Sequence, residues 1–191
     1  MKIILKEIAS IQVGYSFRSR LESMSAGEIA VIQMKDLTGQ NRVDCDNLVR
    51  VDMENPKEHH LVRPGDLVFR SRGLVTTSAI LSTDPGKAMV AAPLFRIRTT
   101  HENVVPEYLN WFINQAPAQA YLASHARGTA QQMISKEAME ALEVVVPALA
   151  RQRAIVELAS MAEQEQDLIK KIAEKRWQYI STMLLESTEG E

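Results

Sequence analysis

The segment 67–72 has the pattern of a strand whose outer face could hold phosphates or guanine bases. As a strand it places Leu67 and Phe69 on one face and Arg70 and Arg72 on the other. Arginine presents a planar fork of donors that can bind a phosphate or the edge of a guanine through two hydrogen bonds. The segment therefore predicts two neighbouring guanidinium groups that are suited to DNA.

The segment 89–98 repeats this pattern, with Arg96 and Arg98 on a shared face, and Pro93 within it predicts an edge strand or a bulge. Between residues 61 and 100 the chain has six basic and two acidic residues, although its net charge is −2. A local excess of positive charge favours binding to DNA phosphates. The alternative is that these arginines form the solvated outer face of an ordinary soluble domain.

Other polar side chains in predicted loops and at strand ends could contact DNA. Amide side chains suit adenine, and hydroxyl, tyrosine and lysine groups suit the backbone. Two glutamines follow Gly128 in a loop whose alternative role is packing against the domain. The candidate DNA-binding residues are Tyr15, Arg18, Gln33, Lys35, Arg70, Arg72, Lys87, Arg96, Arg98, Thr129, Gln131 and Gln132.

The residue types needed for catalysis are missing at useful spacings. His59 and His60 are adjacent, so a helix or strand should turn them apart, and His101 and His125 have no acid or cysteine at ligand spacing. The sequence contains no phosphate-binding GxxxxGK[ST] loop and no GxSxG motif, and Cys45 lacks the local signature of a nucleophile. We therefore predict a protein that is not an enzyme, with no metal site and no cofactor.

Composition indicates a soluble protein that acts in the cytoplasm. The chain has 191 residues, of which 46% are hydrophobic and 24% charged. The single cysteine excludes an internal disulfide and agrees with a reducing compartment. No run of about eighteen apolar residues is present, so we expect no membrane span.

The order of predicted elements favours an α+β fold. Alternating and β-branched residues predict strands first, and helical spacing follows from Pro106 onwards. Strands followed by helices are typical of α+β domains. We expect strands within 27–37, 43–51, 67–72, 76–81, 89–98 and 142–146, and helices from Pro106, from Pro117 with Ala120 and Tyr121 facing inwards, and over 136–142 after the cap Ser135.

The C-terminal segment repeats apolar residues every seven positions and contains no proline or glycine from 151 to 186. It predicts one long helix that forms a coiled coil within or between chains. Glu165 and Arg176 occupy seam positions, which favours antiparallel pairing centred near residues 170 and 171. Packing of the helix on its own domain is the alternative. The seam residues are Ile155, Ala162, Ile169, Arg176 and Met183 on one position, and Leu158, Glu165, Ile172 and Tyr179 on the other.

Six landmarks in this order resemble the DNA specificity subunits of type I restriction-modification systems. They extend over nearly the whole chain, from about residue 5 to residue 185. The landmarks are IQVGYSF, VIQMKDL, LVRPGDLVFRSRG, PEYLNWFINQ, GTAQQMIS and VVVPALARQRAIV, the last leading into the heptads.

The resemblance implies a target recognition domain over 1–147 and a conserved coiled-coil helix over 148–187, and we expect a disordered tail over 188–191. Such subunits usually hold two units in one chain, so this chain resembles a half-subunit that pairs with a second copy. A homodimer would read a bipartite, inverted-repeat site. The implied partners are double-stranded DNA, adenine methyltransferase (modification) subunits and, where one exists, a restriction subunit.

A protein of a different class fits the same sequence. The near-neutral charge also suits a coiled-coil adaptor or competitor that binds the modification subunit without reading DNA. Replacing Arg70, Arg72, Arg96 and Arg98 by alanine separates the two, since only a DNA reader loses affinity and salt dependence.

Overall fold

The alternating segments form short strands that are ended by turn residues. The computed structural model describes residues 1–17, 27–53, 56–73, 76–128 and 132–188. The chain divides into two units, Met1–Arg153 and Ala154–Glu191, and each is described by itself. The elements are β1 Lys2–Ile4, α1 Leu5–Ile8, β2 Ala9–Val13, β3 Ile29–Ile32, η1 Met34–Asp36, β4 Val49–Val51, η2 Glu58–His60, β5 Leu67–Arg70, β6 Ser78–Ile80, β7 Ala88–Val90, β8 Leu94–Thr99, α2 Pro106–Ile113, α3 Ala116–Ser124, α4 Lys136–Glu140, β9 Glu143–Val145 and α5 Leu149–Thr188.

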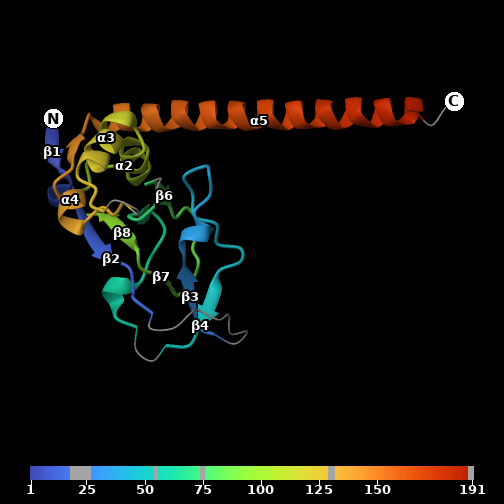
Figure 1. The fold of residues 1–191 in the computed structure, drawn as a ribbon. Helices are drawn as coiled ribbons and strands as arrows, with labels where there is room; N and C mark the ends of the chain where they lie inside the picture. The colour runs from blue at the N-terminus through green and yellow to red at the C-terminus, as the bar shows by residue number, and fades with distance from the viewer. Residues whose placement is uncertain (18–26, 54–55, 74–75, 129–131, 189–191) are drawn as a thin grey trace. The chain divides into compact units, whose positions relative to one another are not determined.

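Two sheets form the centre of the first unit. β2, β8, β5 and β6 lie side by side in that order, and each pair is antiparallel. β3 pairs antiparallel with β4 and parallel with β7 in the second sheet (Figure 1). β1 and β9 form a separate ribbon. The fold is α+β, as the sequence predicts.

The four-stranded sheet is covered on both faces, so the unit has three layers. On one face, Phe69 of β5 joins a buried cluster with Leu5, Leu109 and Leu122 from the helices α1, α2 and α3. On the other face, Val68 belongs to a cluster with side chains of β3 and β7. Successive side chains of a strand point to opposite faces of the sheet, so Val68 and Phe69 belong to two different cores.

Several predicted elements differ from the structure. The expected strand over 89–98 is two strands in different sheets, because the chain turns through Ala92 and Pro93, which are joined by a cis peptide bond. The expected strand over 43–51 is reduced to Val49–Val51. β5 ends at Arg70, so Arg72 does not share a strand face with it. A turn or a change of sheet shortened or divided each of these segments.

The helices begin at the predicted signals. Pro106 occupies the first turn of α2. A backbone N–H at this position has no partner within the helix, so its absence in proline costs no hydrogen bond. The hydroxyl of Ser135 accepts a hydrogen bond from the Ala138 N–H at 3.1 Å and caps α4. In α3 the buried residues are Ala118 and Leu122, and Ala120 is exposed, so its predicted inward position was wrong.

The predicted C-terminal helix is confirmed as α5, which spans 40 residues. At about 1.5 Å per residue it is about 60 Å long. Thr188, which we expected in a disordered tail, is its last residue, and 189–191 lie outside the described part of the chain. Among the described residues, no helix is long and apolar enough to cross a membrane.

Candidate nucleic-acid interface

One end of the two sheets gathers chain segments that are distant in sequence. β2 and β5 finish at this end and β8 begins there, because Val13 pairs with Phe95 and Arg70 pairs with Leu94. β3 and β7 also finish there, and β7 leads directly into β8. We call this the loop end, and it contains the segments after β2, β3, β5 and β7.

The segment after β5 pairs with the loop before α4. Arg72 forms an antiparallel bridge with Met133, and the Ile134 N–H donates to the Ser71 carbonyl at 2.8 Å. The Gly73 N–H donates to the Gln132 carbonyl at 3.1 Å. Two predicted DNA-contacting segments, about sixty residues apart, are therefore neighbours.

Arg70 and Arg72 have different surroundings at this junction. Arg72 and Gln132 are exposed, whereas Arg70 is half-buried. The Arg70 Nε–H donates to the Arg72 carbonyl at 3.4 Å. Gly73 has a φ of 124°, a backbone conformation that glycine adopts far more readily than other residues.

Tyr15 is held against the connection between β7 and β8. Its N–H donates to the Val90 carbonyl at 2.7 Å, and its own carbonyl accepts from the Ala92 N–H at 2.9 Å. Gly14 permits this approach, since a Cβ there would lie 2.6 Å from the Ala91 carbonyl carbon. The backbone at Tyr15 is therefore fixed by contacts that only glycine at position 14 allows.

Gln33 and Lys35 occupy the turn η1 after β3. The Gln33 N–H donates to the Asp36 carboxylate at 2.7 Å, and burial raises the pKa of Asp36 above its ordinary value. The Gln33 Nε2 is buried and has no hydrogen-bond partner among the described residues. Lys35 is exposed. Of these two candidates, Lys35 is the one directly accessible to a ligand.

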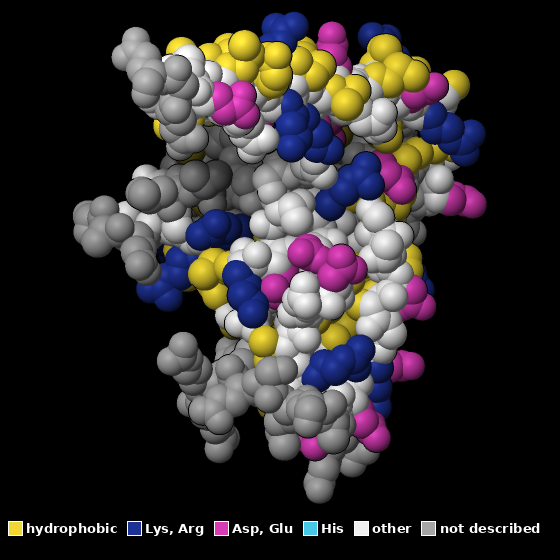
Figure 2. Space-filling view, turned by 90° about the vertical axis from the view of Figure 1, so that its right-hand side faces the viewer, with side chains coloured by type: hydrophobic (Ala, Val, Ile, Leu, Met, Phe, Trp, Pro, Cys, Tyr) yellow, Lys and Arg dark blue, Asp and Glu magenta, His cyan; other side chains and the backbone are white. Residues whose placement is uncertain are grey.

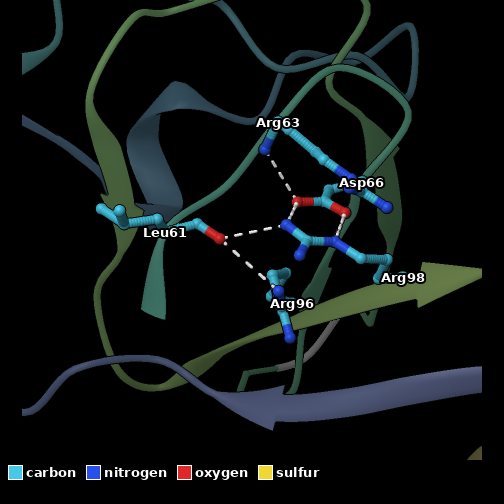
Figure 3. A network of polar contacts seen from close by, with 5 residues as sticks. All are labelled: Leu61, Arg63, Asp66, Arg96 and Arg98. Carbon is cyan, nitrogen blue, oxygen red and sulfur yellow. Dashed lines mark hydrogen bonds and ion pairs between the residues drawn. The ribbon is translucent and has the colours of Figure 1, made fainter. Parts of the chain in front are cut away.

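Arg98 is bound within the protein, away from the loop end. Its Nε and Nη2 lie 2.6 Å from the two carboxylate oxygens of Asp66, and Nη2 also donates to the Leu61 carbonyl at 3.1 Å (Figure 3). The Arg63 N–H donates to Asp66 at 2.8 Å. The hydrogen bonds to Asp66 raise the pKa of Arg98. Arg98 thus braces the turn over 63–66.

Arg96 is buried beside this ion pair, with 6% of its surface exposed. Its Nη1 donates to the Leu61 carbonyl at 3.5 Å, and its Nε has no partner among the described residues (Figure 3). Burial, and then the charge of Arg98, lower its pKa. The two arginines do share a region, as the alternation predicts, but that region is the protein interior.

The predicted contact residues are therefore divided by the fold. The loop end brings together Arg70, Arg72 and Gln132 at one junction, and Tyr15 and Gln33 on either side of Ala91, whereas η1, with Lys35, leads on towards Ile80 beside the start of β5. Lys87 is exposed at the opposite end of β7, and Arg96 and Arg98 are in the interior or braced. Arg18, Thr129 and Gln131 lie outside the described residues.

The sequence analysis missed a cluster of aromatic rings beside Tyr15. The ring centroids of His59 and His60 are 4.2 Å apart, so the prediction that they turn apart was wrong. They lie on the short 3₁₀ turn η2, which brings neighbouring rings together. His60 also lies 5.5 Å from Tyr15, which lies 4.9 Å from Phe17. This cluster depends on the bridge between Leu61 and Met89, which no local pattern indicates.

The predicted seam residues of α5 are mostly exposed. Leu158, Ile169, Ile172, Tyr179 and Met183 each expose between 51% and 68% of their surface. Ala162, Glu165 and Arg176 are also exposed, and Ile155 is half-buried. An exposed apolar stripe of this kind is typical of surfaces that bind another protein.

The comparisons with known proteins agree with the architecture. The chain matches the family described as "Type I restriction modification DNA specificity domain" over residues 1–175. No curated protein matches it.

Solved structures of low sequence identity share the fold. The HsdS subunit from Thermoanaerobacter tengcongensis has 18% identity and a TM-score of 0.64, over 90% of this chain and 39% of that one. A chain from a structure on complex assembly and conformational transition of the type I R-M system has 17% identity and a TM-score of 0.69, over 90% and 40%. The type I S subunit from M. genitalium has 12% identity and a TM-score of 0.59, over 86% and 39%. The chain spans about two fifths of their length, and it belongs to the type I restriction-modification DNA specificity family.

Proposed function

We propose that this chain is a non-catalytic specificity component that reads DNA with the loop end of its first unit and directs a type I adenine methyltransferase to its site. The observation that supports this most is the junction of Arg70, Arg72 and Gln132 at the same end of the sheets as Tyr15. Guanidinium and amide groups on neighbouring loops suit base edges and phosphates. The family match gives this convergence its biological context.

The charges of α5 support antiparallel pairing with a second copy. Residues 157–167 include four acids and no base, and residues 170–176 include four bases and one acid. An antiparallel pair centred near 168–171 places each acidic stretch against the basic stretch of its partner, whereas a parallel pair places like charges together. The same centre brings Glu165 near Arg176.

Such a dimer would read two identical half-sites. Twofold symmetry of the protein requires an inverted repeat in the DNA, and the helices would set the length of the unread spacer. The modification subunits, and a restriction subunit where one is present, would assemble on this dimer. In this proposal the chain itself contributes recognition and spacing.

Selection from randomised duplex DNA tests the proposal. The full chain is mixed with its modification subunit, and bound duplexes are recovered and sequenced. We expect an inverted repeat with a constant spacer. Recovery of no motif, or of an asymmetric motif from a proven homodimer, would contradict the proposal.

Disruption of the seam tests the dimer separately. Ile169→Asp with Ile172→Asp places buried charges in the proposed interface and should give monomers by light scattering. Gln164→Asp with Gln178→Asp is a matched control at exposed positions outside the seam, and it should weaken the dimer much less. Persisting dimers in the seam variant would show that these positions are outside the interface.

An adaptor that binds only the modification subunit is the second candidate. The net charge of −2, and the mixture of acidic and basic side chains on the face seen in Figure 2, favour it over a strongly basic DNA binder. Arg70→Ala with Arg72→Ala separates the two functions. An adaptor keeps its partner and shows no DNA affinity to lose, whereas a DNA reader loses affinity and salt dependence.

A further inference from the structure

The ring cluster lies at the loop end of the first unit. Leu61 forms an antiparallel bridge with Met89, and the Val62 N–H donates to the Ala88 carbonyl at 3.0 Å. This register places His60 and His59 opposite the end of β7, where Tyr15 is bound. The two histidines are thus beside the proposed DNA interface, on a segment that the sequence analysis did not assign to it.

Positive charge surrounds these rings. Lys57 and His59 are exposed, and His60 is half-buried. Burial lowers the pKa of His60 first, and the charges of His59, Lys57 and Arg96 lower it further. The groups that face His60 are Lys57, Glu58 and His59 on its own turn, Tyr15 beside it, Arg96 and Arg98 on β8, and Arg63 and Asp66 on the following turn.

Of the two acids in this group, Glu58 is exposed and Asp66 is already occupied. Both oxygens of Asp66 bind Arg98, and one also accepts the Arg63 N–H. Among the described residues Arg96 has no carboxylate of its own: its Nη1 donates to the Leu61 carbonyl at 3.5 Å, and it shares the charge of Asp66 with Arg98. A buried cation without a carboxylate partner is costly, and an anion nearby would offset that cost.

Two buried nitrogen atoms of this group also lack hydrogen bonds. The His60 Nδ1 and the Arg96 Nε are buried and have no hydrogen-bond partner among the described residues. Such atoms are rare in folded proteins and need a reason. An anionic ligand at the exposed Lys57 and His59 would offset the positive charge around these buried atoms.

We propose that Lys57, His59 and His60 form a contact for a DNA backbone phosphate, with Arg96 behind them as an unpaired positive charge, and that the histidine pair takes up a proton when the phosphate binds. This inference rests on the proposed function and extends it to a second segment. The phosphate adds negative charge beside Lys57, His59 and His60, and it stabilises the imidazolium form. Binding should therefore strengthen as the pH falls.

Affinity measured against pH tests the inference. The full chain with its modification subunit is titrated with the selected duplex at pH 6 and pH 8. We expect binding about tenfold to a hundredfold tighter at pH 6, because uptake of one proton changes the affinity by up to about tenfold per pH unit. His59→Gln with His60→Gln should remove most of this dependence, and His101→Gln, an exposed histidine beyond the far end of β8, should retain it.

Single variants of exposed residues keep the test valid if the double histidine variant fails to fold. His59→Gln alone should reduce the pH dependence, and Lys57→Gln should lower the slope of log affinity against log salt by about one. Neither should change the recovered base motif, because phosphate contacts carry no direct sequence information.

The outcomes separate this inference from the function on which it rests. Affinity that does not vary with pH, or that keeps its pH dependence in the histidine variants, overturns the phosphate contact. If Arg70→Ala with Arg72→Ala still weakens binding in that case, the proposed function stands. Absence of DNA binding at both pH values overturns both.

Discussion

Arg70 and Arg72 form one arginine pair, and Arg96 and Arg98 form another with the same spacing in the sequence. The first pair lies next to solvent and the second lies in the protein interior. Arg72 is exposed and Arg70 half-buried at the loop end, where β5 finishes. Arg96 and Arg98 lie within β8, next to Asp66 and the Leu61 carbonyl. The comparison teaches that the position of a residue along its strand, and what packs over that strand, decide whether an arginine can meet a ligand.

The largest expected effect is at the braced pair. Asp66→Ala should lower the free energy of unfolding by about 3 kcal/mol, since it leaves Arg98 and Arg96 without a carboxylate in a largely buried site. Urea denaturation measures the loss. Combining Asp66→Ala with Arg98→Met should cost less than Asp66→Ala alone, and a loss below 1 kcal/mol would show that the pair does not brace the turn.

The pair at the loop end, Arg70 and Arg72, should affect DNA binding and leave the stability of the fold nearly unchanged. Arg70→Ala with Arg72→Ala should weaken DNA binding about tenfold to a hundredfold and reduce the salt slope by up to about two, as expected for two lost contacts. The free energy of unfolding should change by less than about 1 kcal/mol, because these side chains lack a buried ion pair. A large loss of stability with unchanged DNA affinity would show that Arg70 and Arg72 serve the fold and not DNA binding.

The smallest effect should come from the exposed cation at the far end. Lys87→Ala should change DNA affinity by less than about twofold, because Lys87 lies at the opposite end of β7 from the loop end. Fluorescence anisotropy at two salt concentrations is sufficient to measure it. A loss as large as that of the arginine double variant would mean that the interface extends around the second sheet.

Local sequence signals predicted the elements that depend on local chemistry. Pro106 and Ser135 mark helix starts, and the absence of proline and glycine after residue 151 marks α5, because caps and backbone restrictions act within a few residues. The split of 89–98 into β7 and β8 could not be predicted, since it depends on which sheet each half joins. The same limit applies to His59 and His60, whose position depends on pairing with β7.

By itself, the sequence determined the α+β order of elements, the long helix with its heptad stripe and opposed charges, and the residue types available for DNA. These properties are carried by periodicity, by capping residues and by composition, which need no long-range contacts. Only the tertiary structure decided that the segments at Tyr15, Arg70 and Gln132 meet at one end, and that Arg96 and Arg98 belong to the interior. The reason is strand register: it sets which distant residues become neighbours, and hence which arginines pair with an acid and which stay available to a ligand.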